Sequence, residues 1–126
     1  FAACYVMVDN AASVLVGYYT LSASSVAMRE LPEEIAMKLP RYPSVPVVRI
    51  GRLAVAKEYH GRKLGGMLLI DAIDRAVRSE IAAYAVVVDA KSDDAVRFYQ
   101  HHGFVAFPLL ATTLYLPLSG AVKNLL

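Results

Sequence analysis

The residues best suited to chemistry lie in the stretch YHGRKLGGMLLIDAIDRA, at positions 59–76. Three glycines and two cations fall within the seven residues that begin at His60, and an amphipathic helix follows without a break. The free N–H groups and the dipole of a helix start favour an anion, and glycine lets that anion approach the backbone closely. The stretch therefore predicts an anion site. The alternative is that Gly61 only ends a turn and that Arg62 and Lys63 are solvated.

The spacing of the glycines excludes two common phosphate sites. A P-loop requires an eight-residue motif that ends in Gly-Lys-Ser/Thr, and this motif is missing. A dinucleotide fingerprint requires other glycine offsets than 61, 65 and 66, together with an acidic residue at the end of the next strand. A different anion is needed.

The length of 126 residues fits one domain with a hydrophobic core, and a content of 57% hydrophobic residues argues against disorder. No apolar run approaches the roughly 18–20 residues of a membrane span, so we expect no membrane association. The single Cys4 excludes an internal disulfide and fits a reducing cytoplasm. The chain begins with Phe1 inside an apparent strand and without a signal peptide, so we expect residues to be missing before it.

Hydrophobic periodicity and turn residues predict a β-β-α-β-α-β-α-β-β order. We expect strands over 1–8, 13–22, 45–55, 84–90, 104–107 and 112–118, and helices over 28–39, 61–81 and 93–102. The nearly apolar run 84–90 is typical of a strand that is covered on both faces. This is an α/β layered arrangement, in which ligands bind beyond the carboxyl ends of strands.

The segments RLAVAKEYHGRKLGGMLLIDAIDRA and VVVDAKSDDAVRFYQHHGF resemble the GNAT acyl-CoA N-acetyltransferases, over about Arg49 to Phe107. Within that family they are most similar to the tRNA-acetylating toxins of bacterial toxin–antitoxin pairs, whose Arg-Leu-Ala-Val, Val-Asp-Ala and Phe-Tyr-x-x-x-Gly-Phe segments recur here. The resemblance implies one GNAT domain over 1–126, truncated at its N-terminus. Its fold would be a mixed, mostly antiparallel central sheet flanked by helices, without the family's first strand and helix.

The resemblance also implies that the anion is the diphosphate of acetyl-CoA, held by N–H groups from Arg62 to Met67, and that no metal takes part. The cofactor-binding residues would be Leu53, Ala54, Val55, His60, Gly61, Arg62, Lys63, Leu64, Gly65, Gly66, Met67 and Ser92. Three of them depart from the family pattern. His60 replaces Gln or Arg, Lys63 replaces the first motif glycine, and Ser92 replaces a frequent Asn. If φ of Lys63 is negative, its N–H still donates.

Tyr99 matches the family's general acid, which would protonate the departing CoA thiolate. A thiol near pKa 8.5 and a phenol near 10 make this transfer mildly uphill, and the contribution expected is about 10²–10⁴-fold in rate. The alternative is that Tyr99 only packs on a helix face, as Phe98 and Phe104 are expected to do.

The acceptor can be inferred from the strand 45–55, which has two arginines and no carboxylate or histidine. Without a base, an α-amine near pKa 8 is a better nucleophile than lysine near 10.4, and the cations favour an acceptor with negative charge. Aminoacyl-tRNA meets both conditions. The substrate-binding candidates are Arg49, Arg52, Lys38 and Arg41.

A regular strand would send Arg49 and Arg52 to opposite faces, and a bulge at Gly51 would bring them to one face, so we predict an irregularity there. The alternative is that one arginine pairs with a carboxylate such as Asp89. The pair His101 and His102 is better explained by helix capping than by a metal, and Cys4 is expected to be a buried apolar residue.

Three functions stay open at this point. The first is a toxin that acetylates the α-amine of aminoacyl-tRNA and blocks translation. The second is a GNAT enzyme acting on a small amine or a protein N-terminus, and the third is a CoA-binding domain without catalysis. The toxin resemblance further implies a ribbon-helix-helix-type DNA-binding antitoxin as partner and a homodimer.

Overall fold

A six-stranded sheet forms the centre of the computed structural model, which describes residues 2–37, 43–79 and 82–118. Its order is β1-β2-β3-β4-β6-β5, and every neighbouring pair is antiparallel except β3 and β4, which run parallel. The strands are β1 (Ala3–Asp9), β2 (Val14–Ala27), β3 (Ser44–Val55), β4 (Ala85–Asp89), β5 (Val105–Phe107) and β6 (Leu110–Pro117). The mixed, mostly antiparallel sheet that the family resemblance implied is confirmed.

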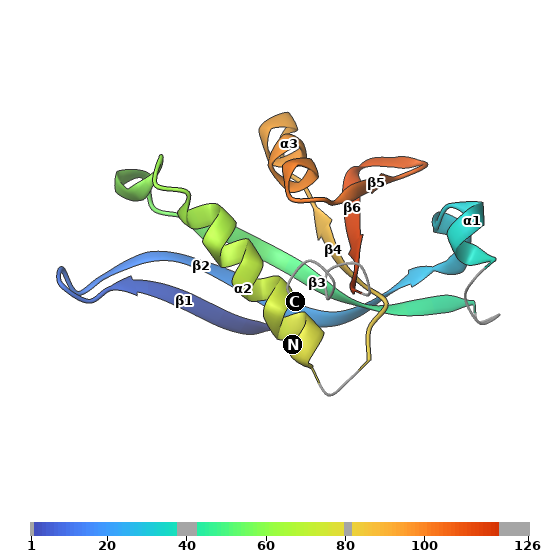
Figure 1. The fold of residues 1–126 in the computed structure, drawn as a ribbon, viewed down its shortest axis with the longest axis horizontal. Coiled ribbons are helices and arrows are strands. Elements are labelled where there is room, and N and C mark those ends of the chain that lie inside the picture. The colour runs from blue at the N-terminus through green and yellow to red at the C-terminus, as the bar shows by residue number, and fades with distance from the viewer. Residues whose placement is uncertain (1, 38–42, 80–81, 119–126) are drawn as a thin grey trace.

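Three helices accompany the sheet: α1 (Glu33–Ala36), α2 (Leu64–Arg78) and α3 (Asp93–His101). In Figure 1, α2 crosses one face of β2 and β3, and α3 stands above the end of β4. None of the described helices is long and apolar enough to cross a membrane.

The predicted helix 28–39 is wrong over its described part. The chain forms a 3₁₀ turn at Met28–Glu30, extends through Leu31 and Pro32, and then makes only one turn of α-helix. Pro32 explains the break, because a proline disfavours helical conformation in the residue before it. The rest of the predicted helix lies outside the described residues.

The core occupies both faces of the sheet. Under α2 and α3, one cluster includes Ile50, Val86 and Val88, and on the opposite face a second cluster includes Val47 and Val87. Successive residues of β4 thus enter different clusters, as the continuous apolar run predicted. Cys4 was expected to be buried, and it is exposed. The reason is alternation, because its neighbours on β1 pack against the first cluster and Cys4 faces the other way.

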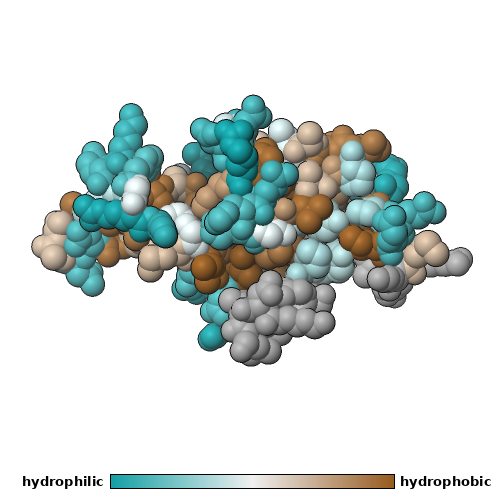
Figure 2. Space-filling model, turned by 45° about the horizontal axis from the view of Figure 1, so that its top comes forward, coloured by the Kyte–Doolittle hydropathy of each residue, from teal (hydrophilic) through white to brown (hydrophobic). Residues whose placement is uncertain are grey.

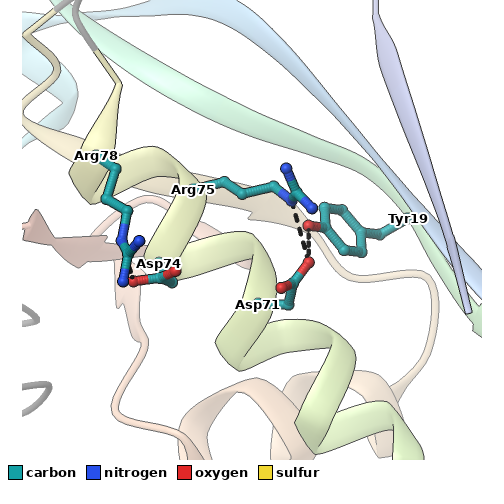
Figure 3. Close-up of polar contacts among 5 residues, drawn as sticks. All are labelled: Tyr19, Asp71, Asp74, Arg75 and Arg78. Atoms are coloured by element: carbon teal, nitrogen blue, oxygen red, sulfur yellow. Dashed lines mark hydrogen bonds and ion pairs between the residues drawn. The ribbon is translucent and has the colours of Figure 1, made fainter.

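Two contacts between α2 and the sheet determine the position of the helix. A Cβ on Gly17 would lie 2.6 Å from the Ala54 carbonyl oxygen and 2.9 Å from Leu68 Cδ1, so only glycine admits this close approach of helix and strand. On the other side, the buried Tyr19 of β2 donates its hydroxyl to Asp71 of α2 (Figure 3). These contacts fix the position of α2, and with it the loop that precedes the helix.

The bulge predicted at Gly51 is present in β3. The register with β2 shifts so that Gly51 and Arg52 together stand opposite Thr20, whose Oγ1 accepts from the Arg52 N–H at 3.0 Å. Ile50 and Leu53, three residues apart, both face the core under α2. Past the bulge, β3 also leaves β4, because their pairing ends at Ile50 while β3 continues to Val55. Figure 1 shows the two strands diverging toward the start of α2 and toward α3.

Candidate functional site

The divergence of β3 and β4 opens a cleft of about 560 Å³ at the carboxyl ends of the two parallel strands. This is the place at which ligands bind in open α/β sheets. The lining residues are Tyr18, Ile50, Gly51, Arg52, Leu53, Ala54, Val88, Asp89, Ala90, Lys91, Ala95 and Tyr99. The cleft therefore joins the predicted Leu53, Ala54, Arg52 and Tyr99, which come from two separate parts of the sequence.

Tyr99 of α3 reaches the cleft from a packed position. Its side chain is 6% exposed, and its ring makes edge contacts with Phe98 and Phe104 at centroid distances of 5.1 and 5.4 Å. Its hydroxyl has no hydrogen-bond partner among the described residues. Every fully buried side-chain polar atom in that part of the chain does have a partner, so the Tyr99 hydroxyl is not fully buried and opens onto the cleft. Burial raises the pKa of Tyr99 to about 12. The phenol is therefore a stable proton donor at neutral pH.

The start of α2 offers free amides. Lys63 is the N-cap residue and makes no side-chain cap, and the first bond into the helix runs from the Met67 N–H to the Lys63 carbonyl at 3.3 Å. Within the described chain, the N–H groups of Leu64, Gly65 and Gly66 have no partner. Together with the helix dipole they form a concentrated donor site for an anion.

In this loop, the condition set for Lys63 is not met, and the expectation for Met67 needs correction. Lys63 has φ +61°, not a negative value, so a lysine holds the left-handed conformation at the place of the family's glycine. That conformation lets the chain turn sharply into α2, at a cost of roughly 1–2 kcal/mol for a residue with a Cβ. Met67 was expected to donate to the ligand, and its N–H is used inside the helix.

Two further residues that were predicted to bind the cofactor make hydrogen bonds within the protein. The His60 ring donates from Nε2 to the Val55 carbonyl at 2.8 Å, which ties the end of β3 to the loop and occupies that carbonyl. Ser92 caps α3, because its Oγ accepts from the Ala95 N–H at 3.1 Å, and it does not line the cleft. The family's Asn contact is therefore not reproduced by Ser92.

The first turn of α2 packs against α3 through two glycines. A Cβ on Gly65 would lie 3.7 Å from the Phe98 ring, and a Cβ on Gly66 would lie 3.1 Å from His102 Nε2. Phe98 precedes Tyr99 on α3, so the turn that carries the free amides packs against the same helix that carries the phenol. The end of the molecule that carries the loop, at the left in Figures 1 and 2, presents mostly hydrophilic surface.

The two arginines of β3 share one face of the sheet but differ in their partners. Ile50 and Leu53 both point into the core under α2, so Arg49 and Arg52 both point to the opposite face. Arg49 pairs with Asp89 at 2.8 Å, as the alternative interpretation held for one of them. Arg52 lines the cleft and has no ion-pair partner among the described residues.

Lys91 was not among the predicted substrate-binding residues, and Asp89 was predicted only as a possible partner of an arginine. Both line the cleft, and their position just after a buried strand was the available signal. Lys38 and Arg41 lie outside the described residues. His102 Nδ1 donates to the Phe98 carbonyl at 2.9 Å, which is the helix-end contact that was predicted.

This fold and cleft indicate an acyl-CoA-dependent transferase domain, and comparison with known proteins agrees with that class. The chain belongs to the acetyltransferase (GNAT) family, whose model matches residues 2–104.

Three individual proteins illustrate the similarity. A tRNA-acetylating toxin of Mycobacterium tuberculosis is 40% identical over 96 residues, which make up 75% of this chain and 57% of the toxin. The structure of AtaT complexed with acetyl-methionyl-tRNAfMet has a TM-score of 0.86 and 26% identity, over 97% of this chain and 74% of that one. An AtaT mutant toxin bound to the C-terminus of the antitoxin AtaR and acetyl-CoA shares the fold at a TM-score of 0.78 and 21% identity, over 97% of this chain and 71% of the other. The chain thus spans less than two thirds of the M. tuberculosis toxin.

Proposed function

We propose that this domain transfers an acetyl group from acetyl-CoA to the α-amino group of aminoacyl-tRNA, and that it acts as a toxin by blocking translation. The observation that carries the proposal is the cleft lined by Leu53, Ala54 and Tyr99, together with the free amides of Leu64–Gly66 on the turn of α2 that packs against the helix of Tyr99. The amides suit a diphosphate, and the phenol suits a leaving thiolate. Family membership and the similarity to a tRNA-acetylating toxin support the same assignment.

In the proposed reaction, the exposed backbone edge of Leu53 and Ala54 beyond the bulge orients the thioester and the pantetheine amides. The amine nitrogen forms a bond to the thioester carbonyl carbon, the C–S bond breaks, and the electron pair stays on sulfur. Tyr99 donates its hydroxyl hydrogen toward that sulfur, and the proton lost by the amine ends on the thiol. Tyr99 is thus unchanged after one turnover.

The raised pKa refines the role of Tyr99. Complete transfer of its proton to a thiolate of ordinary basicity is uphill by about 3.5 pKa units, or about 5 kcal/mol, from a phenol at about 12. This is much more than the mildly uphill step expected from ordinary values. Hydrogen-bond donation to the developing thiolate, without complete transfer, is therefore the favoured form of catalysis.

The charges of the cleft favour an acceptor that is negatively charged and whose amine is neutral without the help of a base. Among the described residues that line the cleft, the one carboxylate is Asp89, which pairs with Arg49 and accepts from the Thr113 hydroxyl at 2.9 Å. Arg52 and Lys91 remain as cations on the cleft walls. An α-amine attached to RNA fits this balance, whereas a polycationic amine does not.

The decisive experiment incubates full-length protein with labelled acetyl-CoA and total charged tRNA, in parallel with Tyr99→Phe. We expect label in the RNA fraction, released by mild base as an N-acetyl amino acid, and its loss in the variant. Label only on protein or small amines would replace this proposal by a general GNAT activity. No label at all, with CoA still bound, would indicate a non-catalytic CoA-binding domain.

The partners are inferred from the similarity to toxins alone. We expect a ribbon-helix-helix-type antitoxin, a homodimer, and action in the cytoplasm, where aminoacyl-tRNA is found. Co-expression with the adjacent open reading frame, followed by light scattering of the purified complex, tests the first two.

A further inference from the structure

His102, at the end of α3, stands beside the first turn of α2. Its Nε2 lies 3.1 Å and its Cε1 3.6 Å from the point where a Cβ on Gly66 would be. A residue with a side chain at position 66 would push the imidazole away, so glycine at this position admits the ring. The ring is half-buried and sits beside a turn whose amides are free.

The hydrogen bond of the ring shows which of its two nitrogens is free for a ligand. Nδ1 lies 2.9 Å from the Phe98 carbonyl oxygen, and because a carbonyl only accepts, Nδ1 carries a hydrogen. Nε2 has no hydrogen-bond partner within the described chain. Nε2, the atom that faces α2, is therefore the ring nitrogen that remains available to a ligand at this turn.

The charges around Nε2 depend on whether an anion is bound. The free amides and the positive end of the α2 dipole lie on one side, and Lys63 and Arg62 directly precede that turn. On its own helix, the ring meets His101 at a centroid distance of 5.2 Å and the partly negative carbonyl end of α3. No carboxylate pairs with the ring among the residues described. A diphosphate at the amides would supply the missing negative charge.

We propose that His102 is a further binding residue of the diphosphate site, and that it takes up a proton at Nε2 when the diphosphate of acetyl-CoA binds. The proposal rests on the function proposed above and deepens it, because it makes cofactor affinity depend on pH. A charge-assisted bond from an imidazolium to phosphate oxygen is stronger than one from a neutral ring. We therefore expect CoA-type ligands to bind about three- to tenfold more tightly at pH 6 than at pH 8.

The test measures binding of dephospho-CoA by titration calorimetry at pH 6, 7 and 8, in buffers of different ionisation enthalpy. Dephospho-CoA keeps the diphosphate and lacks the phosphomonoester, whose own second ionisation near pH 6 would otherwise contribute protons. Pantetheine, which has no diphosphate, is the ligand control. Wild-type protein should take up a fraction of a proton with dephospho-CoA and none with pantetheine.

The variant His102→Gln should lose both the proton uptake and the pH dependence, while its neighbour His101→Gln should keep them. The ring signals of His102 in the wild-type protein, followed by NMR with and without dephospho-CoA, give a second readout that needs no variant. Binding that is independent of pH, or uptake that survives in His102→Gln, overturns this inference and leaves the acetyltransferase proposal intact. Failure to bind dephospho-CoA and CoA at any pH overturns both.

Discussion

Arg49 Nη1 lies 2.8 Å from Asp89 Oδ2, and this pair joins β3 to β4 just before the two strands separate. Arg49 also approaches Ser24 Oγ at 3.3 Å. Its charge is therefore balanced within the protein. The same is true of Asp89, the only carboxylate among the described residues that line the cleft. The cations that remain for an acceptor on this cleft are Arg52 and Lys91.

Replacing Arg52 by alanine should weaken tRNA binding several-fold and reduce the slope of log affinity against log salt by about 0.7–0.9, the loss of one phosphate contact. Filter binding of charged tRNA at several salt concentrations measures both quantities. Arg78→Ala is the matched control, because Arg78 pairs with Asp74 on α2 and does not line the cleft. An equal loss in the two variants would show that the effect is only one of overall charge.

Replacing Tyr99 by phenylalanine should lower kcat about 10²–10⁴-fold with little change in the KM for acetyl-CoA. The pH dependence follows from the raised pKa. A phenol with a pKa of about 12 stays protonated through neutral pH, so its donor form is lost only at much higher pH. The kcat of the wild-type protein should therefore show no decline from this residue between pH 7 and 10. A decline near pH 10 that disappears in Tyr99→Phe would contradict the buried environment of the phenol.

The sequence predicted those features that local chemistry determines. A glycine-rich loop before an apolar stripe was sufficient to place α2 and its free amides, and Gly51 between two arginines was sufficient to predict the bulge. It also supplied the alternative that proved correct for Arg49. In the first two cases the residues concerned are neighbours in the chain, whereas the partner of Arg49 lies 40 positions away and was named only as one alternative.

Features that depend on distant segments were not predictable in this way. The approach of His102 to Gly66 requires α3 to end beside the start of α2, 36 positions earlier in the chain, and neither segment contains a sign of the other. The left-handed φ of Lys63 was not predictable either, because a lysine rarely adopts this conformation and only the geometry of the entry into α2 imposes it.

Replacing Lys63 by glycine should therefore raise the free energy of unfolding by about 1 kcal/mol. Glycine adopts φ +61° without the Cβ conflict, and this gain exceeds the added freedom of the unfolded chain. Urea unfolding measures the change. Lys57→Gly is the control, since Lys57 lies in a right-handed 3₁₀ turn and should lose stability instead. If both variants are destabilised, the left-handed conformation of Lys63 is not the source of strain.

Replacing Gly17 by alanine should lower stability by about 1–3 kcal/mol, as overpacking does elsewhere. The new methyl group would meet the Ala54 carbonyl oxygen at 2.6 Å, and that backbone belongs to the cleft, so CoA binding should weaken as well. Gly65→Ala provides the comparison in thermal unfolding. Its methyl group would meet only Phe98 and Val55 at ordinary contact distances, and alanine favours the helix. Equal destabilisation by the two variants would contradict the close packing described for Gly17 against Ala54 and Leu68.

Replacing Tyr19 by phenylalanine should remove the hydroxyl that binds Asp71 and cost about 1 kcal/mol at pH 7. The hydrogen bond from Tyr19 is the main cause that lowers the pKa of Asp71, with Arg75 contributing after it (Figure 3). A carboxyl whose folded pKa is lowered stabilises the protein above its unfolded value of 3.8, and this stabilisation is lost as the pH falls through the folded pKa.

The difference in stability between wild type and Tyr19→Phe should therefore be full at pH 7 and shrink below about pH 4. Urea unfolding at pH 7.0 and 3.0 measures it. Tyr5→Phe is the matched control, because the Tyr5 ring stacks on Tyr19 at 5.2 Å and carries Arg75 over its face, while its hydroxyl makes no hydrogen bond among the described residues. Tyr5→Phe should change stability little and without dependence on pH. A Tyr19→Phe deficit that stays constant between the two pH values would mean that the hydroxyl of Tyr19 stabilises the protein equally with protonated and with ionised Asp71, which contradicts a bond that depends on the carboxylate charge.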